Sequence, residues 1–481
     1  MSQSNDLTPL PGSSRTAILA YLGISALVFV LMMLLGVVMR LGQATWLSIP
    51  ADLFYQVMTA HGAGMVGISG LAASGVMWYF LRRHVDLTVG ILWANLGFFL
   101  TGVVLILGGI FLGGYAGGWT FLFPLPAYGM GMWGPIGAGC FLGGLLLIGV
   151  GFLLLYLDVA RAIMARFGSL GRALGWPQLF LGSNEPAPPA PVVAATMVLI
   201  VNIAGILAGA VVLVLLLINL FYPSFEVDPL LTKNLTYFFG HVFINATIYQ
   251  AVIAVYEILP EYTKRPWKVN RVFLGAWTAS TVMVMAVYPH HLLMDFVMPT
   301  WALILGQIMS YMGGFPILIV TAWGALTIVH RSGITWDMPS GLLFLSMFGW
   351  AVGVVPAVID GTIAVNHIMH NTMWVPGHFH MYLIVGLVAM LFGFKYYLTN
   401  QQGQVTVIDK IAFWLFSLGG CAFSISFLNS GYNSVPRRWA VHLPEWTALS
   451  EGASVFALLV ALGTTIFALR FLTNLTRARR Y

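Results

Sequence analysis

Six of the eleven histidines lie inside long apolar segments, and their joint placement is the strongest sign of chemistry in this sequence. A lone histidine in such a segment is usually hydrogen-bonded to a neighbour, because unpaired polar groups are costly in an apolar medium. Counted from the segment ends at about 1.5 Å per residue, however, all six fall in one shared layer. We therefore predict that they bind haem or metal: His61, His241, His290, His291, His378 and His380.

The spacing of three of these histidines indicates haem ligation. His378 and His380 are two residues apart, so on a helix they point about 200° away from each other and cannot share one metal. Each can instead serve a different haem, one on either side of the helix. A haem with one histidine ligand keeps an open face for a substrate, whereas a haem with two can only pass electrons. His61, on another segment, is the candidate second ligand of one of them.

The other three histidines indicate a separate, smaller metal site. His290 and His291 are adjacent and follow Pro289, which loosens a helix at that point. They could share a small ion with His241 from a neighbouring segment. Three imidazoles suit copper, iron or zinc by ligand type.

The elements that must position these residues are membrane-spanning helices. Only 7% of the 481 residues are charged and 59% are hydrophobic, whereas a soluble domain is about 25% charged. Most of the surface must therefore face lipid, and no basic run indicates nucleic acid. Spanning the bilayer takes roughly 20 apolar residues per helix, and backbone groups in lipid must be bonded internally. The fold class predicted is an all-α membrane protein with twelve transmembrane helices, near 16–40, 54–81, 88–114, 134–157, 191–220, 232–259, 270–291, 299–330, 338–363, 372–397, 407–430 and 446–472.

The distribution of basic residues predicts the orientation. If the segments alternate, seventeen of the 21 Lys and Arg fall on one side and four on the other: Arg40, Lys233, Arg437 and Arg438. The basic side is expected to be cytoplasmic. This gives a cytoplasmic tail over 1–15, one catalytic domain over 16–472 and a cytoplasmic tail over 473–481. The first segment is expected to be an uncleaved span, and 158–190, which ends in PAPPAP, is expected to be a loop or flexible join.

Four stretches of the sequence resemble the haem–copper oxidase superfamily. HNTMWVPGHFHMYLIVG at 370–386 resembles the segment of its catalytic subunit I that carries both axial histidines. AHGAGM at 60–65, GHVFIN at 240–245 and YPHHLLMDF at 288–296 resemble its other ligand segments, in the family's order. HNTMWVPGHFH and the later VPRR at 435–438 are most similar to the B-type branch.

The resemblance, which covers about residues 16–440, implies a role for each matching residue. His61 and His380 would bind a low-spin haem, expected to be haem b, and His378 a high-spin haem whose type stays open. His241, His290 and His291 would hold copper, with iron as the alternative. Arg437 and Arg438 would pair with haem propionates. It also implies a cupredoxin-type subunit II on the outer side, with cytochrome c, a cupredoxin or quinol as donor, in a bacterial or archaeal plasma membrane.

The sequence departs from the oxidases at a position that bears on the substrate. They carry a tyrosine four residues after the first copper-ligand histidine, or in another branch six residues before the histidine pair. Here these positions are Asn245 and Val284, and Tyr288 is expected to project elsewhere. Four-electron oxygen cleavage needs the electron that this tyrosine supplies, whereas reducing two NO to N₂O and water needs only two. We therefore predict a nitric oxide reductase with Asn245 and His378 as catalytic residues, and a B-type terminal oxidase as the alternative.

Protons must reach such a site, and other classes of protein must be weighed. Tyr249, Tyr256, Glu257 and Thr281 could form a path from the cytoplasm with the help of water. An electron-transfer-only di-haem membrane cytochrome would leave three of the histidines without a role. A twelve-helix transporter would bind its substrate near the midplane, whereas these histidines lie toward one face.

Overall fold

The chain folds as an all-α membrane protein, as predicted. The computed structural model describes residues 12–399 and 403–475, so the predicted tails lie largely outside the described residues. Within this part, twelve helical segments are long and apolar enough to cross a membrane. They are α1 (Gly12–Gln43), α2 (Ala51–Leu81), α3 with η1 (Val89–Leu112), α4 (Pro135–Phe167), α7 (Ala190–Phe221), α8 with α9 (Pro229–Thr263), α10 with η2 (Arg271–Leu292), α11 with α12 (Thr300–Val329), α13 (Met338–Asp360), α15 with η3 and α16 (Trp374–Thr399), α17 (Val407–Tyr432) and η4 with α18 (Pro444–Asn474).

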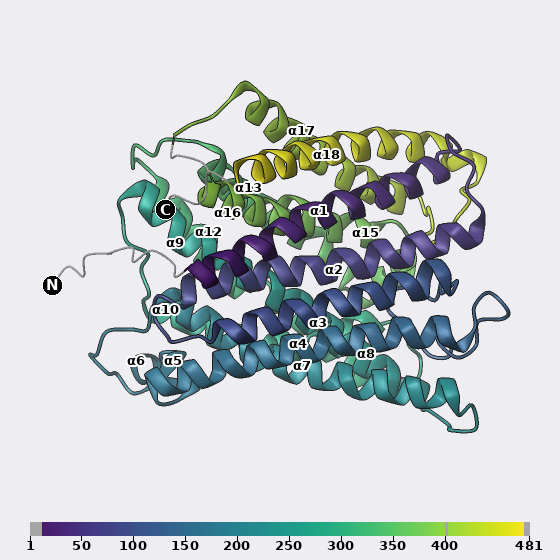
Figure 1. Ribbon diagram of the computed structural model, residues 1–481, viewed down its shortest axis with the longest axis horizontal. Helices are drawn as coiled ribbons and strands as arrows, with labels where there is room; N and C mark the ends of the chain where they lie inside the picture. The colour runs from purple at the N-terminus through teal and green to yellow at the C-terminus, as the bar shows by residue number, and fades with distance from the viewer. Residues whose placement is uncertain (1–11, 400–402, 476–481) are drawn as a thin grey trace.

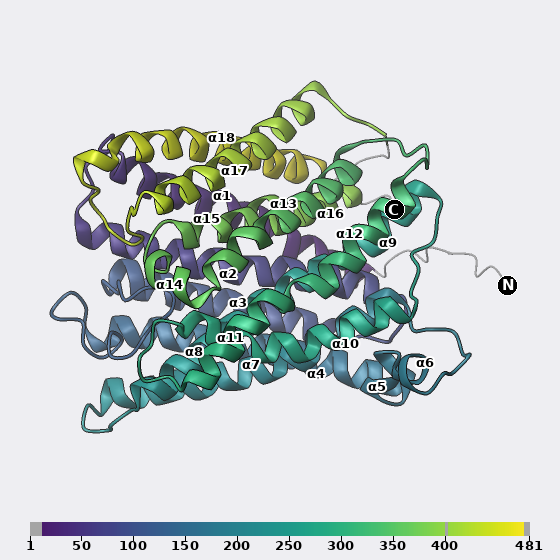
Figure 2. The same cartoon turned by 180° about the vertical axis from the view of Figure 1, so that it is seen from behind.

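These segments run side by side along the long axis of the molecule (Figure 1). The first helices, α1 to α4, cover one side, and α10 to α13 with α17 cover the opposite side (Figure 2). The three most buried spans are α2, α8 with α9, and α15 with η3 and α16, and each carries at least one of the predicted haem or metal ligands. Three short helices sit in the connections: α5 (Leu170–Ala173), α6 (Trp176–Phe180) and α14 (Ile363–Met369).

Several spans depart from regular α-helix where the histidines occur. α10 (Arg271–Ala286) gives way to the 3₁₀ turn η2 (Tyr288–Leu292), and α15 (Trp374–His380) to the π-helix η3 (Met381–Val388). The 3₁₀ turn is tighter than an α-helix and the π-helix is wider, and π-helical turns are frequent at functional sites. The eighth span is interrupted at Gly314, between α11 (Thr300–Gly313) and α12 (Phe315–Val329).

The prediction of a loop beginning at residue 158 was wrong, because α4 continues to Phe167. Asp158 lies within this helix, where it accepts hydrogen bonds from Thr88 and pairs with Arg161 at 2.7 Å. The charged residues that close the apolar stretch therefore mark where the helix leaves the apolar layer rather than where it ends.

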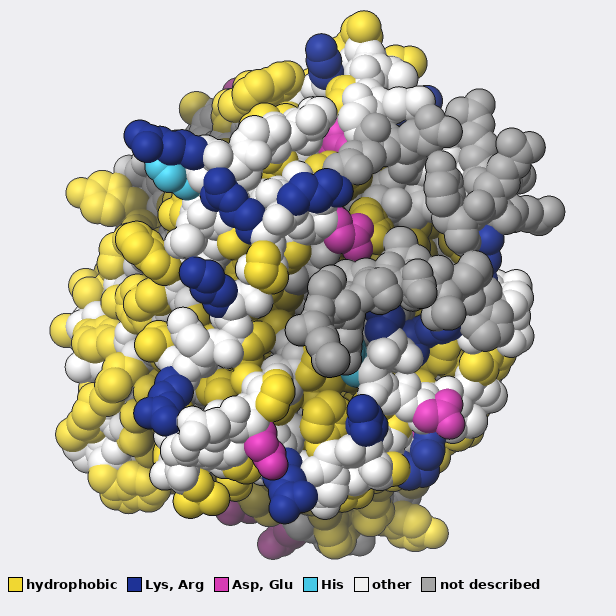
Figure 3. Space-filling view, turned by 90° about the vertical axis from the view of Figure 1, so that its left-hand side faces the viewer, with side chains coloured by type: hydrophobic (Ala, Val, Ile, Leu, Met, Phe, Trp, Pro, Cys, Tyr) yellow, Lys and Arg dark blue, Asp and Glu magenta, His cyan; other side chains and the backbone are white. Residues whose placement is uncertain are grey.

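Basic side chains gather at one end of the bundle, where α2 and α4 end and α10 begins (Figure 3). Arg82 and Arg83 follow α2, Arg166 lies in the last turn of α4, and Arg271 opens α10. His61 lies in the half of α2 nearer the opposite end, and so does His241 in the span formed by α8 with α9. The predicted asymmetry of charge is therefore present in the fold.

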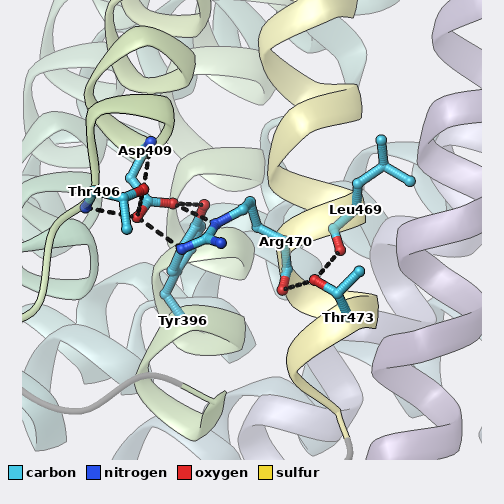
Figure 4. Close-up of polar contacts among 6 residues, drawn as sticks. All are labelled: Tyr396, Thr406, Asp409, Leu469, Arg470 and Thr473. Carbon is cyan, nitrogen blue, oxygen red and sulfur yellow. Dashed lines mark hydrogen bonds and ion pairs between the residues drawn. The ribbon is translucent and has the colours of Figure 1, made fainter.

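An ion pair between a buried carboxylate and a partly exposed arginine ties the last helices together near the basic end (Figure 4). Arg470 of α18 donates from Nε and Nη2 to the two carboxylate oxygens of Asp409 on α17, at 3.0 and 3.1 Å. Tyr396 of α16 (Ala389–Thr399) and Thr406 donate to the same carboxylate. The charge of Asp409 is thereby fully partnered, which is the condition for burying it.

Candidate haem and metal site

His61 of α2 and His380 of α15 face each other as a parallel pair. Their rings are inclined by 11°, and their centroids lie 6.5 Å apart. A metal–imidazole bond of about 2.0–2.1 Å, with about 1.1 Å from nitrogen to ring centre, would place two ligands of one metal about 6.3 Å apart. The spacing therefore fits one metal between the two rings.

Hydrogen bonds fix which nitrogen of each ring is available. His61 donates from Nδ1 to the Met32 carbonyl, and His380 donates from Nδ1 to the Pro376 carbonyl, each at 2.7 Å. Nε2 is therefore the free, unprotonated nitrogen in both rings. Ligating histidines in proteins are oriented in this way by a partner on the second nitrogen, so the pair fits a bis-histidine haem.

Small and aromatic residues shape the space around this pair. Gly36 of α1 leaves room for His61, because a β-carbon there would lie 2.9 Å from His61 Cε1. Phe423 and Phe427 of α17 stand edge-on to the His380 ring at 5.3 and 5.2 Å between centroids. The phenylalanine side chains beside His380 are apolar, which suits contact with the face of a porphyrin ring.

The structure brings His241, His290 and His291 together, as predicted. One nitrogen from each lies within 4.8 Å of the others, and His241 Nδ1 is 3.0 Å from His291 Nε2. Pro289 cannot continue the hydrogen bonding of α10, and η2 turns both of the following histidines toward α8. Nitrogens that bind one ion at about 2 Å lie at most about 4 Å apart, so small side-chain rotations would complete a metal site.

His378 lies apart from the parallel pair and faces a carboxylate. Its Nε2 is 3.6 Å from Asp360 Oδ2, at the end of α13. His378 and His380 thus have different neighbours, since the His380 ring packs against Phe423 and Phe427. Asp360 was missed by the sequence analysis, although the single acidic residue in the segment 338–363 was a signal that could have found it.

Asn245 lies one helical turn after His241, on the same face of α8. Its Nδ2 donates to the His241 carbonyl at 3.0 Å, and its Oδ1 makes no hydrogen bond to another described residue. Tyr288 donates to Asn234 Oδ1 at 3.0 Å and so is directed elsewhere, as expected. A different tyrosine, Tyr237, stacks on the His291 ring at 5.2 Å and was missed, although it precedes His241 by one turn.

Arg437 and Arg438 are placed by a short pairing between two loops. Pro436 and Thr372 form an isolated antiparallel β-bridge. Beside it, Arg437 N donates to the Asn371 carbonyl at 2.9 Å, just before α15 begins. Arg438 adopts the left-handed region, with φ at 67°. Arg437 Nε is buried with no partner among the described residues, and burial, with the nearby Arg438, lowers its pKa to about 10. An unpartnered buried cation of this kind fits an anionic group such as a propionate.

The residues predicted for a proton path are connected only in part. Tyr256 OH lies 2.7 Å from Thr321 Oγ1 of α12, a partner that the sequence did not reveal. Glu257 pairs with Arg83 at 3.3 Å at the basic end. Tyr249 OH is buried without a partner, and Thr281 donates to the Trp277 carbonyl of its own helix. The structure therefore joins Tyr256 to α12 and Glu257 to Arg83, but among the described residues no hydrogen bond links any two of the four predicted path residues.

The chain is similar to known proteins along nearly all its length. The profile of the family described as "Cytochrome C and Quinol oxidase polypeptide I" matches residues 16–466. Cytochrome c oxidase polypeptide 1 of Halobacterium salinarum is 25% identical over 454 residues, which are 89% of this chain and 72% of that protein. The probable quinol oxidase subunit 1 of Staphylococcus aureus is 27% identical over 247 residues, 49% of this chain and 36% of that protein.

Structural similarity supports the fold. A chain from the cryo-EM structure of a heme-copper terminal oxidase dimer superposes with a TM-score of 0.78 at 19% identity, covering 98% of this chain and 85% of the other. Beyond the Halobacterium protein, the chain spans half or less of the length of the curated relatives it matches.

Proposed function

This chain belongs to the cytochrome c and quinol oxidase polypeptide I family, and we propose that it is the catalytic subunit of a membrane nitric oxide reductase. Two NO, two electrons and two protons would give one N₂O and one water. Membership of the family makes the chain an oxidoreductase subunit of the respiratory electron-transport type. The choice of NO over O₂ rests on the residues beside the three-histidine cluster.

We assign the ligands as the sequence predicted. His61 and His380 would hold the low-spin haem, His378 the high-spin haem, and the three-histidine cluster copper, with iron as the alternative. When bound, the high-spin haem and the third metal supply electrons to substrate held between them. All six side chains are partly buried, and the hydrogen bonds that orient His61 and His380 and the grouping of the three-histidine cluster support the assignment.

The observation that carries the proposal is Asn245. Residues four apart share a helix face, so its side chain lies on the His241 side of α8, where the oxidases of this superfamily would place a tyrosine. An amide cannot supply the electron that oxygen cleavage requires. With Nδ2 bound to the His241 carbonyl, Oδ1 is the group left to interact with substrate or a bound proton.

Protons and electrons would enter the protein at opposite ends of the bundle. We place the basic end in the cytoplasm, so that Glu257 and Arg83 lie at the proton entrance and Tyr256 with Thr321 higher in the bundle. Electrons would enter from the opposite side, through a cupredoxin-type subunit II supplied by cytochrome c, a cupredoxin or quinol.

A direct test compares the two gases on the purified protein. With an artificial electron donor, we expect consumption of NO with one N₂O formed per two NO, and slow consumption of O₂. Gas chromatography of N₂O and an oxygen electrode measure both rates on one preparation. Fast oxygen consumption with little N₂O would defeat the proposal.

A terminal oxidase is the second candidate function, and two observations favour it. The relatives named above are oxidases or probable oxidases by name. Tyr237, stacked on His291, could supply the electron and proton that Asn245 cannot. In that case Tyr237→Phe would abolish oxygen turnover, whereas an NO reductase should tolerate the change because the ring contact is kept.

A further inference from the structure

Two buried side chains away from the three-histidine cluster lack the partner that their chemistry calls for. Arg40, in the last turn of α1, is only 5% exposed, yet it makes no ion pair with any described Asp or Glu. Its guanidinium instead lies 4.9 Å from the ring centroid of Phe427. His442 is equally buried, and its Nε2 has no partner. A buried charge without a counter-charge is costly, so this arrangement fits an anion that is not part of the chain.

One turn of α18 holds the two residues in place. Ser450 Oγ lies 2.7 Å from His442 Nδ1, and Ser454 donates to the Arg40 carbonyl at 3.0 Å. The Ser450 hydroxyl can donate its single hydrogen either to Nδ1 or to the Trp446 carbonyl, which lies farther away at 3.1 Å. When it donates to Nδ1, Nε2 carries the imidazole hydrogen and is the free donor. Burial and the nearby Arg40 charge lower the pKa of His442 to about 4, so in the chain alone the imidazole is neutral.

Arg40 is connected to the parallel histidines through one aromatic ring. Phe427, which lies under the Arg40 guanidinium, is 5.2 Å from the His380 ring. Gln43, one turn after Arg40, donates to the Trp439 carbonyl at 2.6 Å and joins α1 to the loop that carries Arg438. Arg40, His442 and the Arg437–Arg438 loop thus lie on connected elements near the parallel histidines.

We propose that Arg40 and His442 bind one propionate of the low-spin haem, in addition to the contacts of Arg437 and Arg438. Arg40 neutralises the carboxylate, and His442 donates to it from Nε2 as a positioning residue. The inference rests on the low-spin haem of the proposed function but not on the choice of NO as substrate. The negative charge of a propionate stabilises the oxidised haem and so lowers its reduction potential. Because Arg40 and His442 offset that charge, losing either residue lowers the potential and favours the oxidised haem.

The test is a redox titration of the low-spin haem absorbance in the purified protein. In His442→Ala we expect the equilibrium to shift three- to tenfold toward the oxidised haem, about 30 to 60 mV at 59 mV per factor of ten for one electron. His442→Gln, whose amide can still donate, should recover most of the shift, and Arg40→Lys should show an intermediate one. His84→Ala is the matched control, because His84 Nε2 is also buried without a partner but lies at the basic end. The reduction potential of the low-spin haem should not change in this variant.

The outcomes separate this inference from the proposed function. An unchanged potential in every His442 and Arg40 variant that retains the haem overturns the inference alone. Absence of a low-spin haem from the unmodified protein overturns both the inference and the haem assignment. The expected shifts in a protein that makes no N₂O leave the inference standing and overturn only the substrate.

Discussion

The hydroxyl of Tyr256 lies 2.7 Å from Thr321 Oγ1, joining α9 (Ile253–Thr263) to α12 in the buried interior. One turn of α9 away toward the basic end, Glu261 accepts a hydrogen bond from Tyr397 and lies 3.9 Å from Arg83. We propose that these two groups, which no printed hydrogen bond joins directly, belong with water to a path that supplies protons from the basic end.

Removing the Tyr256 hydroxyl should slow turnover without disturbing the haems. We expect Tyr256→Phe to lower the NO reduction rate by at least about tenfold, since a positioned proton donor is typically worth more than that. The measurement is the turnover rate with the haem spectrum as reference. Tyr311→Phe is the matched control, because it breaks an equivalent tyrosine–threonine hydrogen bond of 2.6 Å elsewhere. Full turnover in Tyr256→Phe would remove this residue from the path.

Single-histidine variants should separate the two haems. His378→Ala is expected to remove the high-spin haem signal and activity while largely preserving the low-spin spectrum. His61→Ala should do the reverse to the low-spin signal, because the parallel pair loses one ligand. Optical and electron paramagnetic resonance spectra of each variant measure the result. A variant that keeps both signals intact would show its ligand assignment to be wrong.

A single methyl group at Gly36 should disturb the low-spin site. The β-carbon of Gly36→Ala would lie 2.9 Å from His61 Cε1, so the imidazole must shift away from the axis it shares with His380. We expect a weakened or shifted low-spin spectrum with the high-spin signal kept. Gly23→Ala on the same helix is the control, because its β-carbon would meet Leu475 at an ordinary 3.9 Å. Equal spectra for the two variants would contradict the placement of His61.

Loss of one member of the three-histidine cluster should empty the third metal site selectively. His290→Ala leaves only two of the imidazoles that converge there, so we expect the third metal to fall well below one per protein with both haems retained. Elemental analysis of copper and iron against haem content decides which metal is present. A third-metal content equal to that of the unmodified protein would exclude His290 as a ligand.

Truncating Asn245 should reduce NO turnover without emptying the site. Asn245→Ala removes the side-chain oxygen beside His241, and the loss of one such polar group typically costs tenfold or more in rate. Asn245→Asp retains an oxygen in the same place and should keep more activity. Rates are compared at equal haem and metal content. Undiminished N₂O formation in Asn245→Ala would leave the choice of substrate without its main support.

Most of the fold could be predicted from the sequence, because the backbone of twelve apolar stretches must satisfy its own hydrogen bonds in lipid and therefore forms helices. The grouping of His241 with His290 and His291 followed from depth and spacing, and their proximity is confirmed. The helical continuation to Phe167 did not follow, because hydropathy marks the apolar layer and not the last hydrogen bond.

The missed partners share one cause. Asp360 beside His378, Thr321 beside Tyr256 and Tyr237 on His291 are contacts that depend on how helix faces pack against one another. Spacing along one segment reports which face a residue occupies, but not which neighbour meets that face. The roles of the haem-ligand and proton-path residues stay predictions until the variants above are measured.

The two axial positions on α15 are separated by a single residue, Phe379. If His378 and His380 each hold a haem, the interval between the two irons is set by about half a turn of backbone rather than by contacts between separate helices. Breathing motions of the bundle would carry both centres together and leave the tunnelling distance between them nearly constant. The rate of internal electron transfer should therefore depend little on lipid composition or on the motions of the surrounding helices.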